Sequence, residues 1–395
     1  MKVSVWYNNE DIRIEEVPRP KPKDKEMLIK VMSCGICGSD IVEWYRLPRA
    51  PLVQGHEIGA EVVEVGRGVS TYKPGDRVFV APKVPCMRCT YCKNGHYPVC
   101  ANVDERLPGG FAEYILVPEA LVENGTYRLP DCVSYDQSTF IEPLACVVRA
   151  QQLAGVRKNQ TVMVMGSGMS GLLHIKLAKT KHCRVIATDI NPKKLEIAAN
   201  MAADITLDAA KDVPEQLVAE NSRKADVVFL CTSAMTAVDQ VWNCVDKGGV
   251  IVFFAVPHPD KKVTIPINHF WTRETRIITS YYCGPPDIDA AINLIDNAIR
   301  HTLEGGQVVV KVSMEQGYAR ISINDTGVGI PEEDLQYVFE RFYKADKART
   351  LGKGGTGLGL AIASSIIHAH GGKIYAESKV GEGTSFIFLL PLLKM

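Results

Sequence analysis

Five apolar segments alternate with helix-like segments between residues 155 and 283, and this alternation limits the fold of the chain more than any other feature. The apolar segments are VMVMG, RVIATD, ADVVFLC, GGVIVFFAV and RIITSYY. Segments such as SGLLHIKLAKT and KKLEIAANM, which have helical periodicity, lie between them. Because strands that alternate with helices form parallel sheets, the sequence predicts a doubly wound α/β domain over residues 153–286.

The first of these strands leads into a glycine-rich turn. The stretch VMVMGSGMSGLLHIKLA places Gly166, Gly168 and Gly171 in the pattern G-x-G-x-x-G between a strand and a helix. In that context the glycines allow a tight turn and let a pyrophosphate approach the helix N-terminus. Asp189 ends the next strand, where a carboxylate binds a ribose 2′-hydroxyl and repels a 2′-phosphate. The sequence therefore predicts NAD rather than NADP as the cofactor; the alternative for Asp189 is an ordinary turn residue.

A short polar loop holds four cysteines with the spacing C-x2-C-x2-C-x7-C, namely Cys86, Cys89, Cys92 and Cys100. Four thiolates in one loop suit a tetrahedral structural zinc site. An iron–sulfur cluster is the alternative, because it uses the same ligands.

The N-terminal part, residues 1–152, has short β-type runs broken by Gly and Pro, among them MLIKVMSCGICGSD, GAEVVEVG and DRVFVAP. These runs predict a mostly β domain. Within it Cys37, His56 and Glu57 could supply sulfur, nitrogen and oxygen ligands to a second metal ion.

The motifs CGICGSD, GHEIGAEVVEVG and the four-cysteine loop, in this order, resemble the zinc-dependent medium-chain alcohol dehydrogenases over about residues 1–290. The resemblance implies a GroES-like catalytic domain followed by a Rossmann NAD-binding domain. It also implies that Cys37 and His56 are catalytic zinc ligands and that Glu57 is a neighbouring or exchanging ligand.

Within the family, the polyol and threonine dehydrogenases are the branch with a glutamate at the position of Glu142 in FIEPLACVV, which implies a further zinc ligand there. Cys146 is the alternative for that role. Asp40 would orient His56, and Ser39 would relay the substrate's proton toward solvent. The implied reaction is hydride transfer between a small secondary alcohol, a polyol or an amino alcohol, and NAD. The resemblance further implies one catalytic and one structural Zn²⁺ and a homo-oligomer, either a dimer or a tetramer.

The last hundred residues follow a different pattern. The motifs NLIDNAIRHT, NDTGVGI, FERFY and GKGGTGLGLAI resemble, in order, the four nucleotide-binding boxes of sensor histidine kinases over about residues 293–395. This implies an α/β two-layer sandwich of the type shared with gyrase and Hsp90 (GHKL, or Bergerat), over residues 287–395 and truncated at its start. The residues implied in binding ATP and Mg²⁺ are Asn293, Asn297, Arg300, Asp325, Gly327, Gly329, Gly355, Gly357 and Gly359.

The chain therefore resembles a fusion of two incomplete domains. The segment that returns to the catalytic domain after the last Rossmann strand is expected to be absent, and no helix carries a phospho-accepting histidine, so kinase activity is not expected. An ATP-binding module on a dehydrogenase scaffold is the alternative function. A chain with neither activity is a third reading. A natural fusion, an engineered join and a misassembled gene would all give this pattern.

The join lies inside one expected helix, Asp289–Thr302. At 3.6 residues per turn its apolar side chains share one face across the point where the families change, with Asp287 as a candidate N-cap. The members of that face are Ile288, Ala291, Ile292, Ile295 and Ile299.

Charge and hydropathy narrow the choice of partners. Lysine plus arginine and aspartate plus glutamate number 45 each, so no net charge favours nucleic acid or an acidic membrane. No apolar run is long enough to span a bilayer, and the N-terminus lacks the layout of a signal peptide. We expect a cytoplasmic enzyme with a small-molecule substrate.

Overall fold

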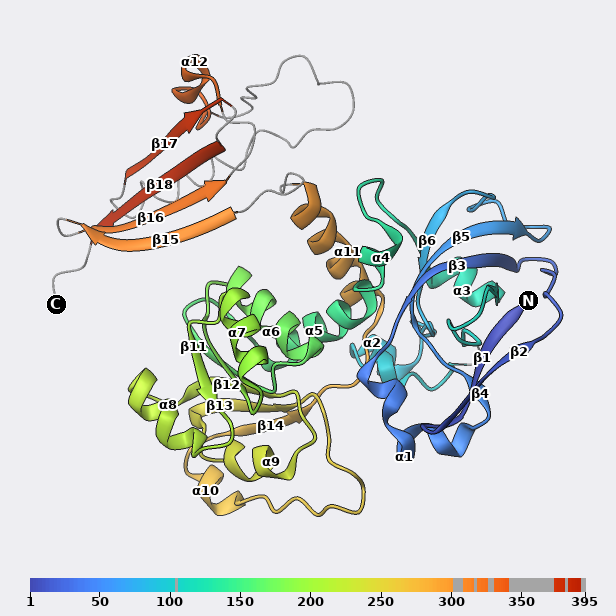
Figure 1. Cartoon of the computed structure of the whole chain (residues 1–395), viewed down its shortest axis with the longest axis horizontal. Coiled ribbons are helices and arrows are strands. Elements are labelled where there is room, and N and C mark those ends of the chain that lie inside the picture. The colour runs from blue at the N-terminus through green and yellow to red at the C-terminus, as the bar shows by residue number, and fades with distance from the viewer. Residues whose placement is uncertain are drawn as a thin grey trace. The chain divides into compact units, whose positions relative to one another are not determined.

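The computed structural model describes residues 1–103, 106–300, 308–315, 318–325, 330–340, 373–380 and 383–391. The chain divides into two compact units, Met1–Asp296 and Asn297–Met395 (Figure 1). Three sheets lie in the first unit and a four-stranded sheet lies in the second.

Two antiparallel sheets form the N-terminal part of the first unit. One has the order β7-β3-β5-β6-β8 and the other the order β2-β1-β4. Alternate residues of the central strands, such as Met27 and Ile29 on β3, point to the same face of the sheet and pack in one buried cluster. The prediction of a mostly β domain is confirmed. The strands are β1 (Lys2–Asn8), β2 (Asp11–Glu16), β3 (Met27–Gly35), β4 (Leu52–Val53), β5 (Glu57–Val65), β6 (Arg77–Val80), β7 (Tyr114–Val117) and β8 (Thr126–Arg128).

Short helices connect these strands, and one longer helix leads to the next sheet. They are η1 (Gly38–Ile41), α1 (Glu43–Arg46), η2 (Leu47–Arg49), α2 (Thr90–Lys93), η3 (Tyr97–Val99), α3 (Glu119–Asn124), α4 (Tyr135–Ser138) and α5 (Ile141–Ala154).

A six-stranded parallel sheet follows, with the order β11-β10-β9-β12-β13-β14. This is the doubly wound order. From β9 the chain first adds β10 and β11 on one side, and it then crosses back to add β12, β13 and β14 on the other side. The prediction from the alternating apolar segments is confirmed. The strands are β9 (Thr161–Met165), β10 (Arg184–Asp189), β11 (Ile205–Asp208), β12 (Ala225–Leu230), β13 (Val245–Phe253) and β14 (Arg276–Thr279).

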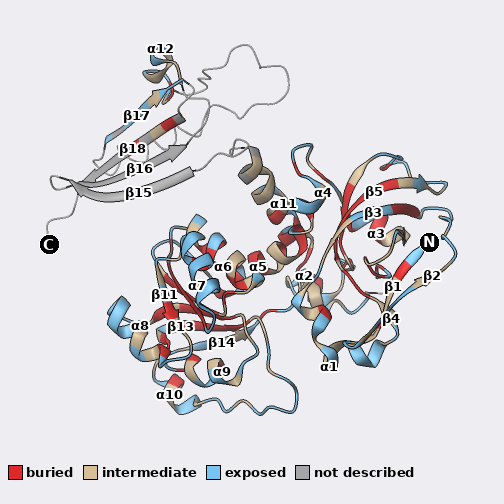
Figure 2. Ribbon diagram, viewed as in Figure 1, coloured by how far each residue is buried: buried red, intermediate tan, exposed pale blue. Residues whose placement is uncertain are grey.

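Helices cover both faces of this sheet (Figures 1 and 2). On β9, Val162 and Val164 pack with one set of helices, whereas Met163 and Met165 pack with the other. The continuous apolar run of β9 is needed because both of its faces are buried. The first set is α5, α6 (Met169–Thr180) and α7 (Pro192–Asn200); the second is α8 (Val213–Asn221), α9 (Met235–Val241) and α10 (Ile267–Trp271).

The helix at the join, α11, spans Pro285–Arg300. Ile288 and Ala291 are buried in a cluster with Phe79, Leu129 and Ile141 of the N-terminal domain. Its partly buried Ile292 and Ile295 belong to the same cluster, which confirms that this part of the apolar face is used.

The packing of α11 shows that the first part of the returning segment, which was expected to be absent, is present. Ala290 and Leu294, on a neighbouring face, pack beside Val147 and Val148 of α5. The chain after β14 therefore does return to the N-terminal domain, as far as Asp296, the last residue of the first unit.

The prediction that Asp287 is the N-cap of this helix is wrong. The helix begins two residues earlier, at Pro285, and Asp287 N–H donates to the Gly284 carbonyl at 3.0 Å. The Asp287 carboxylate accepts from Gly284 N–H at 2.8 Å, so it stabilises the helix start from inside the first turn. A proline pair at the first helical positions suits this start, because their missing N–H groups need no partner there.

The second unit contains an antiparallel sheet of order β15-β16-β18-β17. The predicted hairpin is formed by β15 (Val308–Glu315) and β16 (Tyr318–Asp325), and the predicted last two strands are β17 (Lys373–Lys379) and β18 (Gly383–Pro391). A short helix, α12 (Glu332–Leu335), is also described, whereas the predicted helix of GLAIASSIIHAH lies outside the described residues.

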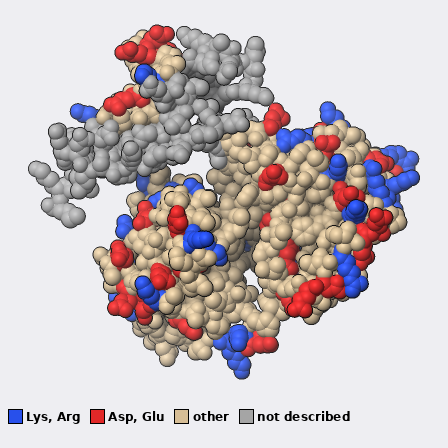
Figure 3. Space-filling model, in the orientation of Figure 1, with Lys and Arg blue, Asp and Glu red and all other residues tan. Residues whose placement is uncertain are grey.

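Acidic and basic side chains are interspersed over the visible face of residues 1–296 (Figure 3). Among the described residues, no helix combines the length and the apolar character that crossing a bilayer requires.

One histidine of the Rossmann domain is buried without a partner. His174 of α6 has no exposed surface, and neither ring nitrogen makes a hydrogen bond with a described residue. Its ring packs against Phe229 and Phe254, with ring centroids 4.1 and 4.8 Å away. Burial lowers its pKa to about 3, with a smaller contribution from Lys181. The imidazole is therefore neutral in the folded state at neutral pH.

This histidine predicts a specific acid sensitivity. Because the folded-state pKa lies below the ordinary value, the unfolded state binds more protons as pH falls below about 6.5, and stability is lost toward the folded pKa. Between pH 7 and pH 5 the unfolding free energy of the parent protein falls as His174 becomes harder to keep neutral. We expect the fall in His174→Leu to be about 2 kcal/mol smaller than in the parent. Urea unfolding at the two pH values measures this difference. The exposed variant His182→Asn should follow the parent, and equal losses in all three proteins would contradict the prediction.

Candidate active site

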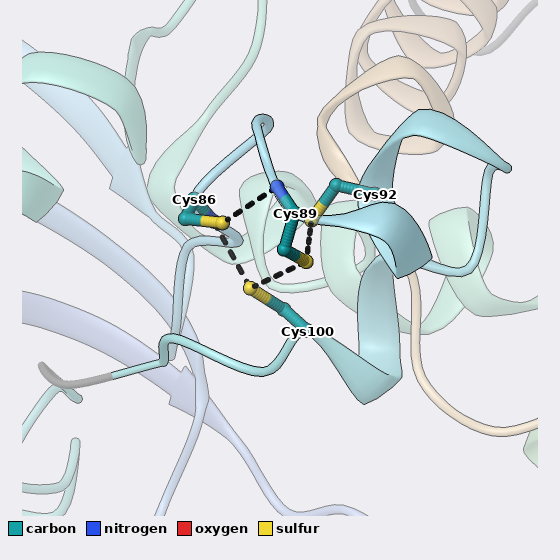
Figure 4. A group of neighbouring side chains, drawn as sticks. All are labelled: Cys86, Cys89, Cys92 and Cys100. Atoms are coloured by element: carbon teal, nitrogen blue, oxygen red, sulfur yellow. Dashed lines mark hydrogen bonds between the residues drawn. The ribbon is translucent and has the colours of Figure 1, made fainter.

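The four cysteines of the polar loop converge in space. The ligand atoms of Cys86, Cys89, Cys92 and Cys100 all lie within 4.8 Å of one another (Figure 4). The Cys89 Sγ is 3.5 Å from the Cys92 Sγ and 3.9 Å from the Cys100 Sγ. All twelve cysteines of the chain are free thiols, so this loop is not closed by a disulfide.

Backbone N–H groups point at these sulfurs. Cys86 N–H donates to Cys100 Sγ at 3.2 Å, and Cys89 N–H donates to Cys86 Sγ at 3.4 Å. The backbone N–H of Arg88 is the main cause that lowers the pKa of Cys86, to about 6. Four sulfurs at this separation, with amide donors that favour thiolates, fit a tetrahedral zinc ion and would equally fit an iron–sulfur cluster.

A second group forms where β3 ends and β5 begins. These strands are antiparallel, and Gly35 pairs with Glu57 in register. The residues that follow β3 and precede β5 therefore lie together, which brings the ligand atoms of Cys37, His56 and Glu57 within 4.8 Å of one another. A Cβ at Gly35 would lie 2.1 Å from the Glu57 Oε2, so a larger residue there would displace the Glu57 carboxylate from its present position.

The buried carboxylate of Asp40 contacts both Cys37 and His56. It is 3% exposed and accepts from Cys37 N–H at 3.1 Å. Its Oδ1 is 3.5 Å from His56 Nδ1 and 2.9 Å from Arg46 Nη2. A carboxylate that holds Nδ1 leaves Nε2 of the imidazole free to bind a metal ion.

Arg46 was not predicted from the sequence, yet it links two predicted residues. Its guanidinium donates to the Ser39 Oγ at 2.8 Å, to the Ser39 carbonyl at 3.0 Å and to Asp40. The spacing offered a weak signal, since Arg46 ends α1, one short helix after the Cys37–Asp40 turn. Arginine is otherwise common on surface helices.

The electrostatics of the group favour a bound cation. Burial, followed by the charge of Glu142, raises the pKa of Glu57 to about 7. Burial acts to lower the pKa of His56, but the hydrogen bonds to Asp40 and Cys37 outweigh it and raise that pKa to about 11. A site that holds extra protons in this way gathers negative charge, which a divalent metal ion would offset. The sulfur, nitrogen and oxygen donors fit zinc in an open catalytic site.

Glu142 lies near this group, since its charge acts to raise the pKa of both His56 and Glu57. It is buried at the start of α5, and its Oε1 accepts from the Cys146 thiol at 3.4 Å. Its ligand atom lies within 4.8 Å of those of Cys146 and Cys283, and it is not in the set formed by Cys37, His56 and Glu57. Both residues weighed for the further ligand position thus share one cluster, and Cys283 joins it without having been predicted.

The contacts of Asp40 predict that its replacement weakens metal binding and lowers activity. We expect Asp40→Asn to lower metal affinity at the neighbouring group, or kcat/KM, by about 10- to 100-fold, because the amide cannot replace the negative charge that holds His56 and Arg46. Chelator competition and initial rates measure the two quantities. Asp76→Asn, which removes another Asp–Arg pair of the same domain, is the matched control and should leave both unchanged. An Asp40→Asn protein with parental affinity and rate would contradict this role.

The glycine-rich turn has the geometry expected for a dinucleotide. Gly166 has φ +98°, and a Cβ on Gly171 would lie 2.0 Å from the Gly166 carbonyl oxygen. A Cβ on Gly168 would meet nothing within 4 Å, so open space lies where a pyrophosphate would approach the start of α6. The turn follows β9, at the point where the strand order reverses.

Asp189 ends β10, as predicted, and is nearly buried beside this turn. Its carboxylate accepts from Ser167 N–H at 3.0 Å and from Asn191 N–H at 2.9 Å. Lys194 Nζ lies 4.0 Å away. These contacts fix the carboxylate at the carboxyl end of the sheet, where the ribose of a dinucleotide binds in doubly wound folds.

Few of the residues assigned to ATP and Mg²⁺ lie where side chains are described. Asn293 is exposed on the part of α11 that belongs to the first unit. Asn297 and Arg300 follow on the same helix and belong to the second unit. Asp325 ends β16 and is paired in register with Val308 and Thr384. Gly327, Gly329, Gly355, Gly357 and Gly359 lie outside the described residues.

Three family models match the chain in succession. Residues 23–130 match the alcohol dehydrogenase GroES-like domain, and residues 171–297 match the zinc-binding dehydrogenases. Residues 289–394 match the histidine kinase-, DNA gyrase B- and HSP90-like ATPases. The last two matches overlap within α11.

Individual proteins show the same similarity. Sorbitol dehydrogenase of Bacillus subtilis (strain 168) is 33% identical over 282 residues, which cover 68% of this chain and 78% of that protein. D-xylulose reductase A of Aspergillus oryzae is 31% identical over 302 residues, covering 72% and 83%. A structure from Sinorhizobium meliloti 1021, described as a zinc-binding dehydrogenase bound to NADP, is 30% identical with a TM-score of 0.68 and covers 75% of this chain and 89% of its own.

Proposed function

Because the chain belongs to the zinc-dependent alcohol dehydrogenase family and carries an additional ATPase-like domain at its C-terminus, we propose that it oxidises a polyol-like secondary alcohol with NAD. The observation that supports this most is the convergence of Cys37, His56 and Glu57 over Asp40, in the same unit as an open glycine-rich turn. Two similar proteins, a sorbitol dehydrogenase and a xylulose reductase, act on polyols or their ketoses, which favours this substrate class over an amino alcohol.

The reaction converts a secondary alcohol and NAD⁺ into a ketone, NADH and a proton. When bound, zinc supplies the Lewis acidity that lowers the pKa of the alcohol hydroxyl, and the nicotinamide supplies the hydride acceptor. Cys37 and His56 would hold the metal ion, with Glu57 as a nearby or exchanging oxygen ligand. Asp40 keeps the His56 ring oriented through its 3.5 Å contact.

Ser39 is the proposed proton relay. Its Oγ accepts from Arg46 at 2.8 Å, so one lone pair is occupied while the hydroxyl hydrogen is left to another acceptor. The hydroxyl can then take the alcohol's proton at Oγ as it passes its own toward solvent. The fixed charge of Arg46 stabilises negative charge on Oγ during that exchange.

The choice of NAD over NADP is proposed from Asp189. Its carboxylate is held in place by two backbone N–H groups, and a 2′-phosphate in the same place would meet it at close range. Like charges so placed cost several kcal/mol, so we propose an NAD preference of about 100-fold or more in kcat/KM.

Steady-state rates with sorbitol, xylitol and L-threonine, each with NAD and with NADP, test the proposal on the zinc-loaded chain. Turnover of a sugar alcohol with NAD is the expected result. Preference for L-threonine would show that the substrate is an amino alcohol and not a polyol. Preference for NADP would overturn the role proposed for Asp189. The absence of turnover with every pair would overturn the proposed function itself. The proposed dimer or tetramer is measured separately by light scattering.

A second activity, magnesium-dependent ATP binding without phosphotransfer, is proposed for the C-terminal domain. It is supported by the family match over residues 289–394 and by the position of Asp325 at the end of a central strand. Calorimetry with a non-hydrolysable ATP analogue and Mg²⁺ tests it. We expect binding that Asp325→Ala abolishes and that Glu333→Ala, on the exposed face of α12, retains. A chain that releases no heat of binding would overturn this proposal and leave the dehydrogenase untouched.

A further inference from the structure

Two aromatic contacts join α1 to the carboxyl edge of the parallel sheet. The Tyr45 Oη lies 2.8 Å from the Tyr281 Oη, and the Trp44 ring centroid lies 6.1 Å from that of His258. Tyr281 follows β14 and His258 follows β13, and the two strands are parallel, so both side chains come from loops at the carboxyl edge of the sheet. Ligands of doubly wound folds bind at this edge. The α1 helix therefore borders the space in which cofactor and substrate would meet.

The tyrosine pair, Tyr45 and Tyr281, is linked to the proposed proton relay. Arg46 follows Tyr45 on α1, and its guanidinium carbon lies 5.2 Å from the centroid of the Tyr45 ring. The same guanidinium donates to the Ser39 Oγ at 2.8 Å. One cation thus contacts both a phenol ring of the pair and the hydroxyl that would exchange a proton with the alcohol. A substrate whose hydroxyl reaches Ser39 would therefore lie beside the tyrosine pair.

Three further cations gather around the tyrosine pair. The Lys83 Nζ lies 5.2 Å from the Tyr281 ring centroid, and the Arg49 guanidinium carbon lies 4.6 Å from that of Tyr45. Burial is the main cause that raises the pKa of Tyr281, whereas the charges of Arg106 and Arg49 act to lower it. Lys83 and Arg106 also pair in an isolated β-bridge. Positive charge from three segments of the chain is therefore concentrated beside the tyrosines.

No carboxylate compensates these three charges within the described residues. The Lys83 ammonium donates to the Pro98 carbonyl at 3.1 Å, and two of its N–H groups find no acceptor there. Arg49 donates to the Tyr45 carbonyl at 3.0 Å and forms no ion pair within the same residues. Burial, followed by the charge of Arg106, lowers the pKa of Lys83, as expected where like charges lie together. An anionic ligand would relieve this repulsion.

The phosphates of the cofactor do not explain the three cations. The glycine-rich turn that would receive the pyrophosphate follows β9, whereas Tyr281 follows β14. In the sheet order β14 is the third strand from β9, so about 14 Å separates the two strands. The cations are therefore available to a second anionic group, one that the substrate carries.

A phosphate monoester suits these donors. It carries close to two negative charges at neutral pH and three acceptor oxygens, so it can bind an ammonium and a guanidinium at once. Given the polyol oxidation proposed above, on which this inference rests, we propose that the substrate is a sugar alcohol phosphate. Lys83 and Arg49 bind its phosphate group, while a secondary hydroxyl is oxidised beside Ser39. The ester itself is unchanged, because the alcohol and NAD⁺ give the keto phosphate, NADH and a proton.

Initial rates of the full-length, zinc-loaded chain with NAD compare sorbitol and xylitol with their terminal phosphate esters and with gluconate. We expect kcat/KM for a phosphate ester to exceed that for the free polyol by about 10- to 100-fold, the range that one hydrogen bond to a charged group predicts. Equal values for ester and polyol would overturn this substrate class and leave the polyol dehydrogenase in place. A preference for gluconate would assign the cations to a carboxylate and overturn the phosphate. Absence of turnover with all of these compounds would overturn the proposed function instead.

Two substitutions test the cations themselves. Lys83→Met and Arg49→Gln should each narrow the ratio of kcat/KM for ester and polyol by about tenfold or more, through a higher KM for the ester. Lys30→Met and Arg67→Gln, at exposed positions of the N-terminal domain, are the matched controls and should keep the parental ratio. A ratio does not depend on the fraction of folded protein, so partial unfolding of a variant cannot imitate the effect. A parental ratio in both Lys83→Met and Arg49→Gln would overturn the proposal.

Binding can also be measured without turnover, with inorganic phosphate as the probe. Calorimetric titration of the zinc-loaded chain should show binding that Lys83→Met weakens about tenfold or more and that Lys30→Met retains. Phosphate that binds the parent and Lys83→Met equally would be held elsewhere, and a parent chain that binds no phosphate would lack the site. Either result would overturn the proposal.

Discussion

Replacing Cys37 by alanine lowers kcat/KM for polyol oxidation by about 10³-fold or more, because a Lewis-acidic metal contributes several kcal/mol to such a reaction. Cys37 begins the short turn that places Ser39 and Asp40, and Ser39 N–H donates to its sulfur at 3.4 Å. Alanine keeps the backbone of this turn but removes the sulfur ligand. We therefore expect the effect in kcat/KM and in the metal content, with little change in the unfolding midpoint.

Cys34→Ala is the control for this experiment. Cys34 lies three residues earlier on β3, is half-buried and has a pKa that burial raises to about 12. Cys34 belongs to none of the three groups of described residues whose ligand atoms lie within 4.8 Å of one another, so its removal should leave kcat/KM within about threefold of the parent. Rates measured with a sugar alcohol and NAD decide between the two positions. Equal activity of Cys37→Ala and the parent would show that this group is not the catalytic metal site.

Replacing Cys92 by serine removes one metal ion and lowers the unfolding free energy by about 4 kcal/mol or more, since loss of a structural metal belongs among the largest single-residue effects. Cys92 is 4% exposed, and its sulfur lies 3.5 Å from that of Cys89. The loop contains few apolar residues that could hold it in the absence of a metal ion.

Cys183→Ser provides the comparison, because Cys183 is also buried but lies outside the three thiol clusters. Zinc content and urea unfolding, measured together, separate the loss of a ligand from the loss of a buried sulfur. A Cys92→Ser protein that keeps its zinc and its unfolding midpoint would contradict a structural site in this loop. Visible absorption of the purified protein distinguishes the alternative, since an iron–sulfur cluster is coloured and zinc is not.

Much of the fold could be predicted because the local patterns are strong. The apolar runs of β9, β10, β12 and β13 are buried on both faces, and the glycine-rich turn marks the first βα connection. The edge strand β11 escaped prediction for a physical reason. ITLD has four residues with a single fully buried side chain, Leu207, so neither an apolar run nor clear alternation identifies it.

The candidate site was predictable only where its residues lie close together in the sequence. Cys37 and Asp40 share one turn, and His56 directly precedes the strand that Glu57 begins, so motifs identify them. Arg46 and Cys283 belong to no motif, and their positions depend on how α1 and the loop before α11 pack. The motif around Glu142 favoured it over Cys146 as the further ligand, although one helix face presents both side chains.

The returning helix shows where local and tertiary information differ. The apolar face of α11 was evident from its spacing, but which domain it covers depends on partners more than a hundred residues away, such as Phe79 and Leu129. The overlap of two family matches at residues 289–297 falls on this helix. A helix that buries Ile288 and Ala291 in the dehydrogenase unit supports closure of that unit up to Asp296.

Direct hydride transfer is the central claim, and isotope transfer tests it most directly. A sugar alcohol that carries deuterium on the oxidised carbon is incubated with NAD and the zinc-loaded chain, and the reduced cofactor is analysed by mass spectrometry. The account predicts that deuterium appears in NADH and that a deuterated solvent with unlabelled substrate leaves NADH unlabelled. Unlabelled NADH from the labelled alcohol, or no NADH at all, would contradict it.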